Sequence, residues 1–234
     1  MLEVRNLYVG YYRDLNILQD LTLAARPRQI TAILGANGVG KSTALKAIYG
    51  FLRPNGGEVL LDGENIVRVP THRRILKGLA YIPQQPGIFR DMSVEENLEL
   101  GGWTYRSDRR LVRRRIEQNY ERFPILRDKR RQATGELSGG QQRMVEIGRT
   151  LMSEPRVLLV DEPTAGLSKM LAEEVYRMLI DLRDRDNLTI LLVDQEIRQA
   201  LRIADFVYVL ELGRNKFEGP PSEFDDLEKA FWIG

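Results

Sequence analysis

One segment of the sequence carries glycines, a lysine and a serine at the spacing of a phosphate-binding loop. The run GANGVGKS fits the pattern G-x-x-x-x-G-K-[ST], with its fixed positions at Gly35, Gly40, Lys41 and Ser42. Glycine lets the backbone turn successive N–H groups towards phosphate oxygens, and the start of the following helix adds partial positive charge. The alternative is an ordinary glycine-rich turn before a helix, and the dinucleotide pattern G-x-G-x-x-G is not met. We therefore predict a nucleoside triphosphate site, with Lys41 at the outer phosphates and Ser42 as a ligand of Mg²⁺.

Two adjacent carboxylates follow an apolar run later in the chain. The run VLLV leads directly into Asp161 and Glu162. A buried strand that ends in an acid is typical of the edge where an α/β sheet presents ligand chemistry. Asp161 is suited to hold Mg²⁺, directly or through water, and Glu162 to polarise a water aimed at the terminal phosphate. Alone, the pair would fit a salt-bridged rim equally well, but together with the phosphate loop it indicates a catalytic pair.

The motif LSGGQ at residues 137–141 lies between these two segments. It precedes a helical pattern in which Met144, Ile147 and Leu151 recur on one face. A small hydroxyl and two glycines at a helix start again suit an anion. One nucleotide does not need two such sites in one subunit.

The order of phosphate loop, LSGGQ and VLLVDEP resembles that of the ATP-binding-cassette (ABC) ATPases, and the resemblance covers essentially the whole chain. It implies an α/β protein with the ABC ATPase fold: a mostly parallel phosphate-loop core sheet, an antiparallel β subdomain and an inserted helical subdomain. It also implies that the LSGGQ of one subunit closes over ATP held by the phosphate loop of another. Hydrolysis of ATP with Mg²⁺ would then be a property of a dimer.

The resemblance also assigns roles to single positions. Catalysis falls to Glu162 as general base, with Gln84 and Gln195, and Mg²⁺ contacts fall to Ser42, Gln84 and Asp161. Tyr12 is the aromatic expected to stack on adenine, with Tyr11 as the weaker choice and a core aromatic as the alternative. Gln85 is the second choice for Gln84. The expected nucleotide contacts are Tyr12, Gly35, Asn37, Gly38, Gly40, Lys41, Ser42 and Thr43 in one subunit, and Ser138, Gly139, Gly140 and Gln141 in its partner.

Two positions depart from the common family pattern. Most members carry a histidine at the γ-phosphate where this chain has Gln195, whose amide can donate a hydrogen bond but cannot carry charge or shuttle a proton. The sole histidine, His72, comes too early for that role, and we expect it in a turn or on the surface. Ser168 stands where an aspartate usually closes the loop that crosses the dimer interface.

With these departures, segments such as EPTAGLS and LVDQEIRQAL resemble the second ATPase subunit of branched-chain amino-acid importers. That resemblance implies a second ATPase subunit in a hetero- or homodimer, two membrane-spanning permease subunits and, indirectly, a substrate-binding protein. It implies a peripheral location at the cytoplasmic face of the cell membrane. The alternatives are a related ABC system for urea, amides, other amino acids or lipid, and a mainly nucleotide-binding regulatory subunit. No nucleic-acid partner is expected.

The elements that position these motifs alternate between strand and helix patterns. Continuous apolar strands between helices indicate a parallel sheet covered on both faces. A helix is expected after the phosphate loop, with Leu45, Ile48 and Leu52 on one face, and the C-terminal PPSEFDDLEKAFWIG is predicted as a short helical tail. The strand patterns are LEVRNLYVGY, NILQDLTLAA, ITAILG, EVLLDGENI, LAYIPQ, RVLLVDEP, TILLVDQ and FVYVLELG.

One stretch interrupts that alternation. Residues 90–153 carry helical patterns without strand patterns, and Ser93 and Glu96 stand at capping-box spacing. We predict a single ABC ATPase domain over 1–234. Within it, 1–89 and 154–234 form the α/β core with its antiparallel β subdomain, and 90–153 form the helical signature subdomain.

Composition and charge exclude several classes of site. The 234 residues include 35 Lys+Arg, 33 Asp+Glu, one His and no Cys, which removes disulfide scaffolds, cysteine zinc sites and thiol nucleophiles. No signal-like start and no long apolar run is present, so we expect a protein that is neither secreted nor membrane-spanning. Residues 106–131 hold 11 Lys+Arg and 4 Asp+Glu, a formal +7 within a net +2. We interpret this block as a solvated helix face in the part expected to face membrane subunits and lipid head groups.

Overall fold

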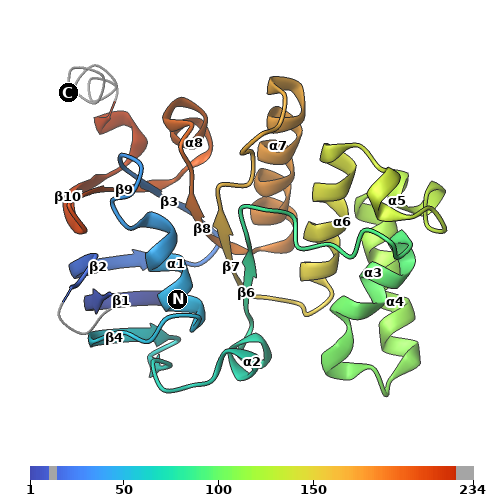
Figure 1. The fold of residues 1–234 in the computed structure, drawn as a ribbon, viewed down its shortest axis with the longest axis horizontal. Coiled ribbons are helices and arrows are strands. Elements are labelled where there is room, and N and C mark those ends of the chain that lie inside the picture. The colour runs from blue at the N-terminus through green and yellow to red at the C-terminus, as the bar shows by residue number, and fades with distance from the viewer. Residues whose placement is uncertain (11–14, 225–234) are drawn as a thin grey trace.

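The structure, a computed structural model, describes residues 1–10 and 15–224, and its strands form two sheets (Figure 1). The six-stranded sheet has the order β10-β9-β3-β8-β7-β6 and is parallel except for its edge strand β10. The four-stranded sheet has the order β2-β1-β4-β5 and is antiparallel. The strands are β1 (Leu2–Val9), β2 (Leu18–Ala25), β3 (Ile30–Leu34), β4 (Gly56–Leu61), β5 (Glu64–Asn65), β6 (Leu79–Ile82), β7 (Val157–Asp161), β8 (Thr189–Val193), β9 (Phe206–Glu211) and β10 (Arg214–Gly219).

The predicted coverage of the parallel sheet on both faces is confirmed by the alternation of its side chains. In β7, Leu158 and Val160 join a hydrophobic cluster with the helices of one face, while Val157 and Leu159 join a cluster with the other face. The second cluster contains residues of α1 (Lys41–Tyr49) and of the antiparallel sheet. Because successive strand residues point to opposite faces, a fully apolar strand is needed to fill both layers.

The helix after the phosphate loop ends earlier than the sequence predicts. Leu45 and Ile48 are buried on its inner face as expected, but α1 stops at Tyr49 because Gly50 adopts φ 96° and forms the C-cap. Leu52 lies beyond the helix, where it is partly buried against the same cluster. The prediction that Leu52 belongs to this helix was therefore wrong.

The helix-rich stretch is confirmed as free of strands, since residues 90–153 contain only an isolated bridge between Ser93 and Ala133. Ser93 forms the predicted capping box: its hydroxyl accepts from the Glu96 N–H, and its own N–H donates to the Glu96 carboxylate at 2.7 Å. Domain boundaries at 90 and 153 stay a prediction. The elements of this stretch are α3 (Val94–Gly101), η2 (Trp103–Tyr105), α4 (Arg109–Arg122), α5 (Pro124–Asp128), η3 (Thr134–Glu136) and α6 (Gly139–Leu151).

The remaining helices are α2 (Thr71–Arg74), η1 (Ile75–Lys77), α7 (Lys169–Asp186), α8 (Ile197–Ile203) and η4 (Pro221–Glu223). His72 is exposed, as expected, and lies in α2. The predicted C-terminal helix falls mainly on residues 225–234, outside the described part of the chain, and residues 221–223 form only a 3₁₀ turn.

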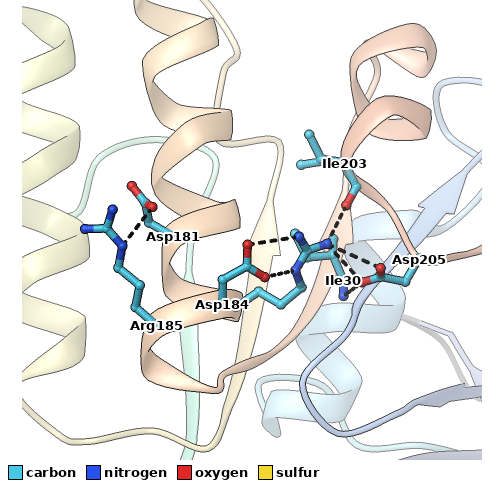
Figure 2. A network of polar contacts seen from close by, with 7 residues as sticks. Ile30, Asp181, Asp184, Arg185, Ile203 and Asp205 are labelled. Carbon is cyan, nitrogen blue, oxygen red and sulfur yellow. Dashed lines mark hydrogen bonds and ion pairs between the residues drawn. The ribbon is translucent and has the colours of Figure 1, made fainter.

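An ion-pair network joins α7 to the end of the parallel sheet at which β3 begins (Figure 2). Asp205, just before β9, accepts a hydrogen bond from the Ile30 N–H at 2.8 Å and pairs with Arg183 of α7 at 3.2 Å. Arg183 also pairs with Asp184 at 2.7 Å and donates to the Ile203 carbonyl. Figure 2 also shows the exposed pair Asp181–Arg185 on the same helix. The network lies at the N-terminal end of β3, whereas the phosphate-loop sequence follows its C-terminal end.

Candidate nucleotide site

The predicted phosphate loop joins the C-terminal end of β3 to the start of α1. Gly35, Gly38 and Gly40 have φ of 147°, 82° and 104°, a left-handed backbone that favours glycine. A Cβ on Gly35 would lie 2.5 Å from the Leu210 carbonyl oxygen, so this position has no room for a side chain. Gly40 is the N-cap of α1, and no side chain caps the helix start. Asn37 and Gly38 are exposed, and Thr43 is buried within α1.

Lys41 turns back over this loop. Its ammonium donates to the carbonyl oxygens of Gly35 at 2.8 Å and Ala36 at 3.0 Å, and the residue is only 4% exposed. Burial lowers the pKa of Lys41, while the nearby carboxylates of Glu162, Asp161 and Asp194 act in the opposite direction. The loop therefore presents a positive charge that is partly desolvated and already oriented.

Ser42 and Asp161 meet at the base of the loop. The Ser42 hydroxyl donates to Asp161 Oδ1 at 2.7 Å, and the Tyr81 hydroxyl donates to Oδ2 at 2.8 Å. Sequence reasoning missed Tyr81, because only the parallel pairing of β6 with β7 brings it beside Asp161. Burial, followed by the Asp161 charge, raises the pKa of Tyr81, so the phenol stays a hydrogen-bond donor.

The oxygens of Ser42 and Asp161 fit Mg²⁺, which prefers hard oxygen ligands and keeps substrate phosphates and waters in its coordination shell. Across residues 1–10 and 15–224, no group of three or more His, Cys, Asp or Glu side chains is arranged to hold a metal ion. The protein therefore provides few ligands of its own, which is the usual situation for a metal bound together with a nucleotide.

Glu162 is held by two amides from distant parts of the chain. Gln84, after β6, and Gln195, after β8, each donate from Nε2 to Glu162 Oε2 at 2.6 Å. Glu162 itself has φ 44°, and its N–H donates to the Val193 carbonyl at 2.8 Å. A left-handed glutamate is uncommon and costs about 1–3 kcal/mol, which indicates a functional constraint. The structure thus brings together the three residues that the sequence assigned to catalysis.

The loop that carries Gln84 is fastened to α6. Arg143, which is 2% exposed, donates to the carbonyl oxygens of Pro83 at 2.9 Å and Gln84 at 2.8 Å. Arg143 also forms a buried ion pair with Glu146, which accepts from the Gly87 N–H at 2.6 Å. Burial raises the pKa of Glu146, and the Arg143 charge opposes that shift. Arg143 and Glu146 lie just after LSGGQ, but nothing in the sequence indicated their partners.

The loop that carries Gln195 is fastened by a buried polar chain. Asp194 accepts hydrogen bonds from the N–H groups of Gln195 and Glu196 and from the Tyr176 hydroxyl at 2.9 Å. The Tyr176 hydroxyl also lies 3.1 Å from the Thr164 hydroxyl, in the loop after Glu162. Burial raises the pKa of Asp194 to about 6, although these hydrogen bonds act to lower it.

The LSGGQ residues form the start of α6. Ser138 is the N-cap, and it exchanges capping-box hydrogen bonds of 3.3 Å with Gln141. Gly139 is exposed and Gly140 is buried. In Figure 1, α6 and α1 lie on opposite sides of β6 and β7, so one chain does not bring LSGGQ to its own phosphate loop. Tyr12, assigned to adenine, and Tyr11 lie outside the described residues.

Comparison with known proteins agrees with these motifs. The sequence matches the family described as ABC transporter over residues 18–165. The chain belongs to this family. It is 40% identical to a probable branched-chain amino acid transport ATP-binding protein, LivF, of Archaeoglobus fulgidus, covering 98% of this chain and 96% of the relative. It is 33% identical to the lipopolysaccharide export system ATP-binding protein LptB of Haemophilus influenzae, covering 95% and 93%.

Solved structures of ABC cassettes share the fold. The cbiO1 structure from Clostridium perfringens, part of the ABC transporter complex cbiONQ, has a TM-score of 0.87 at 28% identity, covering 99% of this chain and 92% of that one. The ADP conformation of the cassette MJ1267 has a TM-score of 0.86 at 26% identity, covering 100% and 98%. The predicted family and fold are confirmed.

As an ABC ATPase, the chain uses ATP and Mg²⁺ and hydrolyses ATP in transport. No helix within residues 1–10 and 15–224 combines the length and the hydropathy needed to cross a bilayer.

Proposed function

We propose that the chain is the ATP-hydrolysing subunit of an importer for branched-chain amino acids, driven by ATP-dependent closure of a dimer. The observation that carries the hydrolytic role is the convergence of Gln84, Glu162 and Gln195 beside the phosphate loop. The amino-acid substrate is supported by the LivF relative and by the BraG relative of Pseudomonas aeruginosa, a high-affinity branched-chain amino acid transport ATP-binding protein at 37% identity.

In this proposal the phosphates bind the N–H groups of residues 35–43 and the ammonium of Lys41. Ser42 and Asp161 hold Mg²⁺ together with Gln84, and the bound ion neutralises phosphate charge. Glu162 accepts the proton of a water whose oxygen attacks the γ-phosphorus as the bond to ADP breaks. Gln195 donates to a γ-phosphate oxygen in place of a histidine, so it orients the group without supplying charge.

The second half of each site comes, in this proposal, from a second ATPase subunit. Ser138, Gly139, Gly140 and Gln141 would close over ATP held by its phosphate loop. Support comes from the separation of α6 and α1 within one chain and from the capping box, which keeps the hydrogen bonds of Ser138 and Gln141 within their own helix (Figure 1). A helix start facing a nucleotide phosphate is favourable because of its partial positive charge.

We place the contact with two permease subunits at a groove of about 720 Å³ between α2, the end of α3 and η2. Its lining includes Phe51, Phe89 and Trp103, which are 56%, 52% and 60% exposed. Large exposed aromatics gathered in a groove are typical of a protein-binding surface. A permease seated there would keep the chain peripherally at the cytoplasmic face of the membrane, with a substrate-binding protein on the opposite side.

The experiment is ATP hydrolysis by the chain assembled with its partner subunits. Lys41→Ala removes the ammonium at the outer phosphates and is expected to lower turnover by on the order of 10²–10³-fold. Lys46→Ala, a matched change in the last turn of the same helix, should leave turnover unchanged. Unchanged turnover in Lys41→Ala would refute the proposed site.

The LptB relatives favour one other candidate, the ATPase of a lipid exporter. The two are separated by reconstituting the complex in vesicles and supplying each substrate. A branched-chain amino acid that raises turnover and accumulates inside supports the importer, whereas stimulation by lipid alone would overturn the amino-acid assignment. A mainly regulatory role is tested by changing Glu162 in only one subunit of a heterodimer.

A further inference from the structure

We propose that the start of α4 and the turn before it bind anionic phospholipid head groups. The surface, called the basic patch, consists of Trp103, Arg106, Arg109, Arg110, Arg113 and Arg114. Residues 103–114 hold five arginines and one aspartate, a formal +4. The proposal rests on the proposed function in one respect, which is that the chain works at a membrane.

Seven of the ten arginines of the +7 block fall into two groups. Arg115 pairs with Glu154 at 2.6 Å, Arg127 pairs with Glu117 at 2.6 Å, and Arg122 pairs with Asp186. By contrast, four arginines on the first two turns of α4 are exposed, and their side chains have no hydrogen bond or ion pair to any residue that the structure describes: Arg109, Arg110, Arg113 and Arg114. Arg130 and Arg131, at the other end of the block, are also exposed without an ion pair, but they line a pocket with Glu95, Glu96 and Glu99. The largest group of positive charge without a nearby acid is therefore the start of α4.

This placement is locally unfavourable for the helix. Arg109 and Arg113, and likewise Arg110 and Arg114, are like charges four residues apart, and such pairs destabilise a helix. Asp108, the N-cap, places one carboxylate at this helix start and accepts from the Leu111 N–H, but the first turn itself contains no acidic residue. Arg109 and Arg110 therefore also lie against the positive end of the helix dipole. Both effects are relieved when anions lie along this face.

Trp103 gives the patch an apolar member. Its indole is 60% exposed, and the Arg106 guanidinium lies 4.3 Å from the ring centroid and donates to the Trp103 carbonyl. An exposed tryptophan beside arginines matches the head-group layer of a membrane, where the ring meets the hydrocarbon boundary and the cations meet phosphates. A nucleic-acid backbone offers the phosphates but no apolar layer, and the patch has one aromatic rather than the series that stacks successive bases.

The patch also borders the proposed permease face. Trp103 lines the same groove as His72 of α2 and Phe89, so the groove and the basic patch are continuous. In Figure 1 the connection from α3 to α4 and the helix α2 lie along the same edge of the molecule. A permease seated in the groove would therefore bring the arginines towards the bilayer surface.

The test is partition of the full chain onto vesicles of phosphatidylcholine alone or mixed with phosphatidylglycerol. Binding is expected only to the mixed vesicles and should weaken as salt is raised. Each arginine near the surface contributes a factor of about five, so Arg109→Gln with Arg113→Gln should lower the partition coefficient by about 25-fold. The matched control is Arg127→Gln with Arg185→Gln, which removes the same charge from paired, exposed arginines and should change little.

Trp103 supplies a second readout. In a Trp232→Phe background, its emission should shift to the blue on the mixed vesicles, and Trp103→Ala should weaken binding several-fold. Equal binding to neutral vesicles, or equal losses in the two double variants, would overturn the proposal. The proposal would also be overturned if Arg109→Gln with Arg113→Gln bound vesicles as well as the wild type but no longer assembled with the permease. Tighter binding of the chain to RNA or DNA than to the vesicles would overturn it as well. ATP hydrolysis should be intact in Arg109→Gln with Arg113→Gln, which changes no residue of the nucleotide site or of the proposed permease groove, so failure here is distinguishable from failure of the proposed ATPase site.

Discussion

The helices α1 and α6 both begin where a phosphate is expected, yet their first turns differ. At α1 the N-cap is Gly40 and no side chain caps the free N–H groups, whereas at α6 a capping box between Ser138 and Gln141 satisfies the N–H groups of these two residues. An uncapped helix start is stabilised when an anion binds, and a capped one is stable without it. This difference supports the proposal that α1 holds phosphate within its own chain, whereas α6 is stable before a partner's nucleotide binds.

The largest expected effect is on ATP turnover and comes from Glu162, which lies outside both helix starts. Glu162→Gln removes the general base but keeps an amide of the same size, so turnover should fall by on the order of 10²–10⁴-fold. ATP binding and dimer closure should persist. The measurement is single-turnover hydrolysis beside nucleotide-dependent dimer formation, with the exposed Glu218→Gln on β10 as the control. Rapid turnover by Glu162→Gln would contradict the base assignment.

A smaller effect contrasts one glycine from each start. Gly40 has φ 104°, and a Cβ there would lie 2.6 Å from Leu18, so Gly40→Ala should lower the free energy of unfolding by about 1–3 kcal/mol. It should also weaken ATP binding by about tenfold. Gly139 has ordinary space for a Cβ, 3.4 Å from Leu167, so Gly139→Ala should leave the stability and ATP affinity of the isolated chain unchanged. Equal effects of the two changes, in chemical denaturation and nucleotide titration, would remove the distinction.

The smallest effect concerns the cap itself. Ser138→Ala removes the side-chain acceptor of the α6 N-cap and should lower the free energy of unfolding by about 1 kcal/mol. ATP affinity of the isolated chain should not change, because α6 is not part of its own phosphate site. Ser93→Ala, which breaks the other capping box, serves as the matched control for stability. A loss of ATP affinity specific to Ser138→Ala would place the two helix starts in one site after all.

The local parts of the site could be predicted from the sequence. The glycines and Lys41 sit next to one another in the chain, and Asp161 ends a strand whose apolar run is unmistakable. The capping box at Ser93 was visible for the same reason, since its two residues are three apart. Each of these depends on spacing within one turn or one strand.

The longer-range parts could not be predicted in this way. Tyr81 reaches Asp161, and Arg143 reaches the Gln84 carbonyl, only because strand order and helix packing bring them together. Strand β10 was missed because its sequence, RNKFEG, is an exposed edge with little apolar alternation. The early end of α1 at Gly50 was missed because the apolar spacing continues to Leu52, beyond the turn that stops the helix.

The fastening of Gln84 to α6 has a mechanical consequence. Arg143 donates hydrogen bonds to two consecutive carbonyls, those of Pro83 and Gln84, and Glu146 accepts a hydrogen bond from the Gly87 N–H in the same loop. The helix that starts at Ser138 is therefore tied to the loop whose Gln84 side chain reaches the Glu162 carboxylate. A tilt of α6 imposed by a neighbouring subunit would therefore move the Gln84 backbone as well. That movement would change the distance between the Gln84 side-chain amide and the Glu162 carboxylate.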